Sequence, residues 1–165
     1  MFKPRFGTRT VYALVVVIAL LAGGGIATAK ASIDVINAID ASALNAFQHQ
    51  VEEQMADGDD NQRLVLGTAP VDKRLVIEYV SFRAQPPAGE EVTLLVLTTT
   101  GGGEGAVHFL PLVQQPGSTF NVWTSNQLTR IYIDAGTTFT ARVRRSSSAG
   151  VTLLDLTVSG HYVDK

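Results

Sequence analysis

The feature that most constrains the fold is the alternation of short β-like runs and compact turns from about Arg63 onward. The runs are rich in Val, Ile, Leu, Thr, Phe and Tyr. The turns recur every ten to eighteen residues or so, an interval typical of sandwiches and barrels. No helix-length stripe with a period of 3.6 interrupts them, which argues against a parallel sheet with crossover helices. The expected turns are 67–72, 85–89, 101–105, 115–118, 125–127, 134–137 and 146–150.

This pattern predicts an all-β domain, an antiparallel β-sandwich of about eight strands, with a jelly roll as one arrangement of them. Within 138–145 the period of two turns one set of side chains inward and the other outward. The inward set is Phe139, Ala141 and Val143, and the outward set is Thr138, Thr140, Arg142 and Arg144. In the last strand, Leu154, Leu156 and Val158 share one side. The runs 74–83 and 92–98 are apolar on both faces, which is typical of central strands.

The segment before this region fits either a strand or a helix. Phe47, Val51 and Met55 are spaced by four, which is two strand periods and also about one helical turn. We expect a strand that the acidic turn 56–61 joins to 63–66 as a hairpin. Residues 32–45 would then be a linker or an N-terminal arm, and 46–165 the β-sandwich domain.

The first thirty or so residues read as a signal for export. Lys3, Arg5 and Arg9 precede an apolar run over 11–22, and small residues follow that suit a signal peptidase. We expect cleavage near Ala31, with 1–31 as the signal peptide and a periplasmic or extracellular product. The alternative is an uncleaved helix that anchors the chain, the one route by which we expect it to meet a membrane.

Charge and cysteine content narrow the classes of function. Nine basic and fifteen acidic residues follow Ala31, a net charge of −6 for the exported part. A surface of that sign argues against binding of nucleic acid, which depends on a positive field. The chain has no cysteine, so neither a disulfide nor a lipid-modified cysteine contributes.

Several phrases resemble a group of small exported bacterial proteins of uncharacterised function. These are KRLVIEYVS (73–81), HFLPL (108–112), IYIDAGTTFTARVRRSSSAG (131–150) and LTVSGHYVD (156–164). The resemblance implies a β-sandwich and bacterial export, and it supplies no functional residue. The last strand also faintly resembles the jelly-roll domains of the complement C1q and tumour necrosis factor type.

The acidic turn is the candidate metal site. Asp57, Asp59 and Asn61 place oxygen ligands at alternate positions, as at the start of a calcium loop. Gln62 and Thr68 then stand where an EF-hand needs glycine and a bidentate glutamate, so only an improvised site remains. We expect no other cofactor.

Catalytic chemistry has little support in the sequence. There is no cysteine nucleophile and no G-x-S-x-G motif. Glu78 and Asp155 interrupt apolar strands and could serve as the carboxylate pair of a small carbohydrate-active hydrolase. The ordinary alternative, that each faces solvent, is favoured because burying an unpaired carboxylate is costly. We therefore expect no enzyme.

Binding is the favoured function, with a glycan or a protein as the ligand. Trp123 and Tyr132 are aromatic candidates that could stack on a sugar or anchor a partner. Arg142 and Arg144, with Arg145 at the strand end, form a local basic stripe that could bind a carboxylate or sulfate, or simply be solvated. A third possibility is an assembly subunit whose arm, 32–55, pairs with a neighbouring copy.

Overall fold

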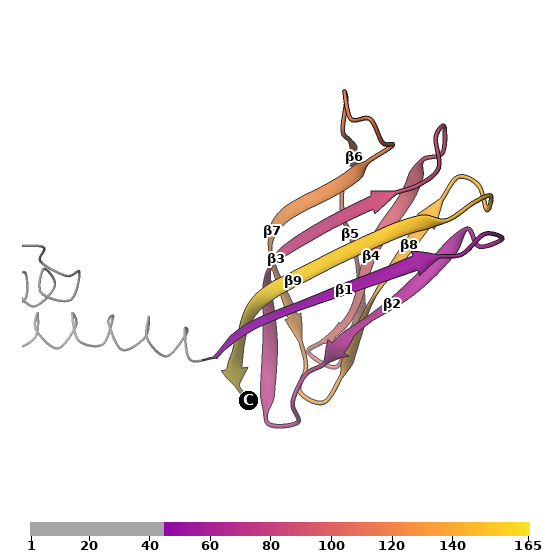
Figure 1. Ribbon diagram of the computed structural model, residues 1–165. Helices are drawn as coiled ribbons and strands as arrows, with labels where there is room; N and C mark the ends of the chain where they lie inside the picture. The colour runs from indigo at the N-terminus through magenta and orange to yellow at the C-terminus, as the bar shows by residue number, and fades with distance from the viewer. Residues whose placement is uncertain (1–44) are drawn as a thin grey trace, which may run out of the picture. The chain divides into compact units, whose positions relative to one another are not determined.

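The computed structural model describes residues 45–165, which form nine strands and no helix (Figure 1). The strands are β1 (Ala46–Met55), β2 (Asn61–Thr68), β3 (Lys73–Gln85), β4 (Val92–Gly101), β5 (Glu104–Phe109), β6 (Val113–Gln114), β7 (Trp123–Ile133), β8 (Thr138–Arg145) and β9 (Thr152–Asp164).

These strands make two antiparallel sheets. Sheet A has the order β1-β9-β3-β7-β6, and sheet B has the order β2-β8-β4-β5. The chain passes repeatedly from one sheet to the other, and only β4–β5 and β6–β7 are neighbouring pairs consecutive in the chain. The prediction of an all-β antiparallel domain is confirmed.

Residues 46–55 form a strand, but the predicted hairpin with 63–66 is wrong. β1 pairs with β9 along its whole length, whereas β2 pairs with β8 in the other sheet. The turn 56–60 therefore crosses between the sheets. This arrangement lets Val51 and Met55 on β1 pack against the same core as Leu64 and Leu66 on β2. β1 is the edge strand of sheet A, with β9 as its one neighbour among the described residues.

One hydrophobic core contains side chains from both sheets, including those predicted to face inward from β8 and β9. The inward sets predicted for β8 and β9 are all buried. Thr140 is an exception on the outward side: it is only 4% exposed, on a strand flanked by β2 and β4.

β3 and β4 are interior strands of their sheets, as predicted. The turn expected at 125–127 is wrong, because these residues lie inside β7 and pair with 80–82 of β3. The hydrogen bonds to β3 keep this polar stretch extended, and the local composition of the stretch does not encode that pairing.

Residues 1–44 lie outside the described residues, and with them the predicted signal peptide and most of the linker. Within residues 45–165 there is no helix long and apolar enough to cross a membrane.

Candidate functional site

Three arginines lie on the outer face of sheet B: Arg63 on β2, and Arg142 and Arg144 on β8. The alternate apolar residues of both strands are buried in the core, so the period of two turns these arginines outward. We call these three residues the arginine face. It contains two of the predicted binding residues, Arg142 and Arg144, and adds Arg63.

Arg63 and Arg142 lie directly opposite each other in the β2–β8 ladder. Arg144 has a carboxylate partner, with its Nη2 3.6 Å from Asp60 Oδ2. Among the described residues, neither Arg63 nor Arg142 has a carboxylate oxygen within 4.0 Å. Like charges directly opposite across a ladder are destabilising. An anion that contacts both guanidinium groups would relieve that repulsion.

Apolar side chains border the arginine face. The register continues from Arg142 to Val96 on β4 and then to Phe109 on β5, which is 74% exposed. Val65 and Val107 are also exposed, and they lie in the neighbouring row of the same face. Arginine forks grip carboxylate, sulfate or phosphate oxygens in pairs. The surface therefore suits a ligand with both an acidic and an apolar part.

Trp123 points inward from β7 in sheet A and packs against the core. It lines a shallow hollow of about 460 Å³ together with Leu94, Phe109 and Leu112. Its indole N–H is buried and has no hydrogen-bond partner within residues 45–165. The structure does not bring Trp123 and Arg142 together, because Trp123 packs against the core from sheet A and Arg142 lies on the outer face of sheet B.

Tyr132 lies apart from the other binding candidates. It is half exposed and lines a groove of about 470 Å³ between β7 and β5, together with His108 and Arg130. Asp134 also lines the groove. Hydrogen bonds from the Gly103 and Gly102 N–H groups hold the pKa of its carboxyl below the ordinary value, and Arg74 adds a smaller effect in the same direction.

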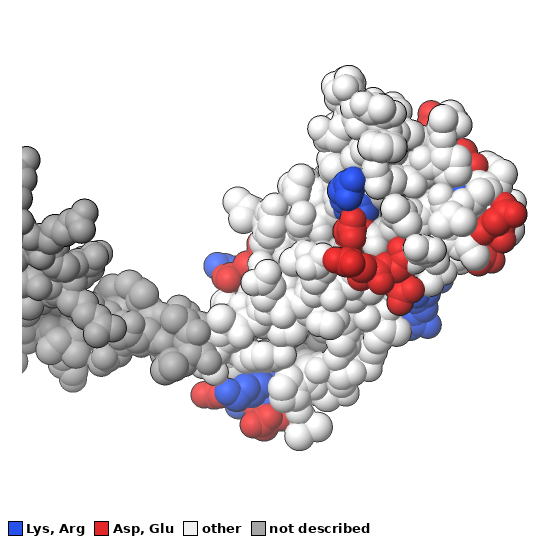
Figure 2. Space-filling view, in the orientation of Figure 1, with Lys and Arg blue, Asp and Glu red and all other residues white. Residues whose placement is uncertain are grey.

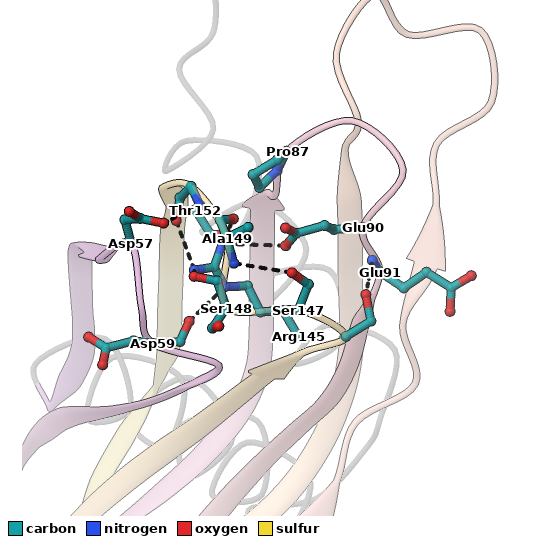
Figure 3. A network of polar contacts seen from close by, with 12 residues as sticks. Asp57, Asp59, Pro87, Glu90, Glu91, Arg145, Ser147, Ser148, Ala149 and Thr152 are labelled. Carbon is teal, nitrogen blue, oxygen red and sulfur yellow. Dashed lines mark hydrogen bonds and ion pairs between the residues drawn. The ribbon is translucent and has the colours of Figure 1, made fainter.

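The predicted metal residues lie at the β1–β2 turn. Hydrogen bonds join this turn to the β8–β9 turn. Asp57 accepts a hydrogen bond from the Gly150 N–H at 2.6 Å, and Asn61 is the first residue of β2. The Asp59 side chain points away from that of Asp57 (Figure 3). Within residues 45–165 no group of three or more His, Cys, Asp and Glu side chains is placed to hold a metal ion.

Arg145 occupies the centre of these turns (Figure 3). The prediction that it belongs to the basic stripe is wrong: its side chain is fully buried, in phase with Val143. It donates hydrogen bonds to seven acceptors across three turns. They are the carbonyl oxygens of Ala56, Asp59, Ser148, Ala149 and Gly150, the Thr152 hydroxyl and the Glu90 carboxylate. Because its donors are all used by these acceptors, the buried Arg145 side chain holds the three turns together and is not free to bind a ligand.

Glu78 and Asp155 do not form a catalytic pair. Glu78 contacts His161 at 3.2 Å, and Asp155 contacts Arg83 at 3.4 Å. From Asp155 to His161 is six positions along β9, about 20 Å, well beyond the ~5–9.5 Å of glycosidase carboxylates.

The outer face of sheet A differs from the arginine face. A group of acidic side chains, with a basic one beside it, lies near the middle of this face (Figure 2). Arg83 pairs there with Asp155, which lies opposite Glu52 in the β1–β9 ladder. One row across it consists of Gln50, Thr157, Ser81 and Asn126. This face therefore combines uncharged hydrogen-bonding groups with a local acidic group that includes Glu52 and Asp155.

Sequence reasoning missed Arg63 and Phe109. The alternation of Leu64 and Leu66 with Arg63 and Val65 would have placed Arg63 on an outer face. Its position opposite Arg142 depends on β2 pairing with β8, which no local pattern specifies.

The comparisons with known proteins supply no function. No protein-family model and no curated protein matches the chain. Among solved structures, a chain of the "Cyanophage Pam1 capsid asymmetric unit" matches at a TM-score of 0.38 and 13% identity, over 72% of this chain and 83% of that one. A likeness of that degree establishes neither a family nor a function.

Proposed function

We propose that the protein is an exported, non-catalytic β-sandwich of jelly-roll topology that binds an acidic protein surface through its arginine face. The topology is supported by the strand orders 1-9-3-7 and 2-8-4-5, in which both sheets combine strands from the two halves of the chain. Export is supported by the sequence of residues 1–31. Mass spectrometry of the mature protein tests it, with an N-terminus at or near Ser32 expected.

The observation that carries the binding proposal is the Arg63–Arg142 pair, which lies on adjacent strands without a carboxylate partner in the described chain. Exposed Phe109 and Val107 favour a protein over a purely ionic ligand, because protein interfaces combine arginine with aromatic and apolar contacts. The acidic character of the rest of the surface keeps the attraction local to this face.

Titration calorimetry with a short peptide of alternating glutamate and phenylalanine tests the proposal. We expect binding that weakens as salt rises and that is lost in Arg63→Gln/Arg142→Gln. The matched control is Arg74→Gln/Arg83→Gln, which removes two exposed arginines from elsewhere. Equal loss in both double variants would show that only net charge matters and would refute the site. Tighter binding of heparin fragments than of the peptide would indicate an acidic glycan instead.

A further inference from the structure

The hollow beside Trp123 lies at the start of β4, next to residues that do not pair with β5. β5 pairs with β4 only from Val96 to Gly101, so the first four residues of β4, 92–95, have β8 on one side and no strand on the other. On that side the Leu95 carbonyl already accepts a hydrogen bond from the Leu110 N–H at 3.0 Å, so the unpaired edge is limited to residues 92–94. A strand edge that lacks a partner is a template for an added strand.

The surroundings of this edge suit a single extended segment. The hollow measures about 460 Å³, within the ~300–1,000 Å³ of ligand pockets, and Phe109, Leu112 and Trp123 line it. A free segment would fit, with one side chain against Phe109 and Leu112.

Trp123 supplies a second, independent indication. Its indole N–H is buried without an acceptor in the described chain. Buried donors are nearly always hydrogen-bonded, so an acceptor carried by a ligand in the hollow would satisfy this N–H. A main-chain carbonyl of an added segment is such an acceptor. Glu91 also lines the hollow and has no ion-pair partner within residues 45–165, so a basic residue in the segment is favoured there.

We propose that residues 92–94 of β4 and the hollow beside Trp123 bind an extended apolar segment of another protein, which carries a basic residue and adds to sheet B as a strand. The segment places a main-chain carbonyl on the Trp123 indole N–H. This site is separate from the arginine face in its chemistry, because it uses neither Arg63 nor Arg142.

The test selects a displayed library of random short peptides against the protein. We expect enriched peptides to combine β-branched residues with a lysine or arginine. Trp123 is the only tryptophan of the chain, so its indole N–H resonance reports directly on the site. Binding should shift that resonance and slow hydrogen exchange of amides within 92–94.

Two variants make the result decisive. Trp123→Phe keeps the aromatic ring and removes the donor, and Leu112→Glu places a charge in the hollow; each should weaken the selected peptides about tenfold. Val113→Glu is the matched control, because Val113 is exposed and lies outside the lining of the hollow. Binding should survive that change, and it should survive Arg63→Gln/Arg142→Gln.

Three outcomes would overturn the proposal. The first is that no peptide is enriched, and the second is that enriched peptides leave the indole resonance unchanged. The third is a mass by light scattering that rises with protein concentration and stays monomeric in Leu112→Glu, which would make a second copy the occupant.

Discussion

Two regions of β8, three residues apart, use the same side chain in opposite ways. Arg145 is fully buried and donates to seven acceptors in three turns. Arg142 is exposed, faces another arginine and has no carboxylate partner in the described chain. The phase of the strand separates them, because odd positions of β8 face the core and Arg142 does not.

The comparison shows that charge alone identifies neither a structural nor a binding arginine. A buried guanidinium is tolerated only when its donors are satisfied, so Arg145 and its acceptors require one another. The exposed pair makes no such contribution to folding. The repulsion between the two guanidinium groups destabilises the fold slightly, and an anionic ligand would relieve it.

Arg145→Met should give the largest effect. It leaves five turn carbonyls and Glu90 without their donor, and loss of one partner of a buried ion pair typically costs about 3–5 kcal/mol. Urea unfolding measures the change. Arg144→Met is the control, because its pair with Asp60 is half exposed and should contribute no more than ~1 kcal/mol. Equal losses in the two variants would erase the distinction.

Glu90→Gln should give a smaller effect. The Glu90 carboxylate lies 3.4 Å from Arg145 Nη1 and is almost buried. The amide keeps an acceptor oxygen but loses the charge, so we expect a loss of about 1–2 kcal/mol. Glu91→Gln, which changes the exposed neighbour, should leave unfolding unchanged. A loss as large as that of Arg145→Met would mean that the carboxylate, rather than the carbonyls, holds the arginine.

Arg63→Gln should change stability in the opposite direction. Removing one member of a like-charged pair should raise the free energy of unfolding by about 0.5 kcal/mol at low salt. The gain should shrink as salt screens the charges. Unfolding curves at low and high salt measure it. A clear loss of stability would show that Arg63 is structural, and the contrast with Arg145 would fail.

Asp134→Asn should give the smallest change in the free energy of unfolding. It extends the comparison to a carboxylate that accepts hydrogen bonds from backbone N–H groups. The pKa of Asp134 is lowered, so its contribution is complete above the unfolded value of about 3.8 and disappears as pH falls through the folded pKa. Acid unfolding should show wild type and variant converging below that pH. Asp72→Asn, on an exposed turn, is the control. A difference that persists at low pH would exclude the carboxylate charge as its cause.

Prediction from sequence succeeded where a local period decides the outcome. The inward positions of β8 and β9 follow from the alternation of apolar residues. The same alternation places Arg145 inward with Phe139 and Val143, and its assignment to the basic stripe overlooked that phase. The turn expected at 125–127 failed because polar residues also occupy strands when neighbouring strands supply the hydrogen bonds.

Prediction failed where distant segments must find each other. The hairpin of 46–55 with 63–66 was the local choice, yet β1 pairs with β9, about a hundred residues later. The candidate site has the same origin: Arg63 meets Arg142 only through the β2–β8 ladder. Phe109 borders the arginine face and the hollow beside Trp123 because β5 lies next to β4, which in turn pairs with β8.

The sequence by itself determined that the described chain is antiparallel β structure and which side chains of most strands face inward, since both depend on spacing along one strand. The tertiary structure decided which strands are neighbours, and therefore which arginines stand together and which donor is left without an acceptor. Sheet order is set by burying one shared core, a property of all the strands at once that no single segment carries.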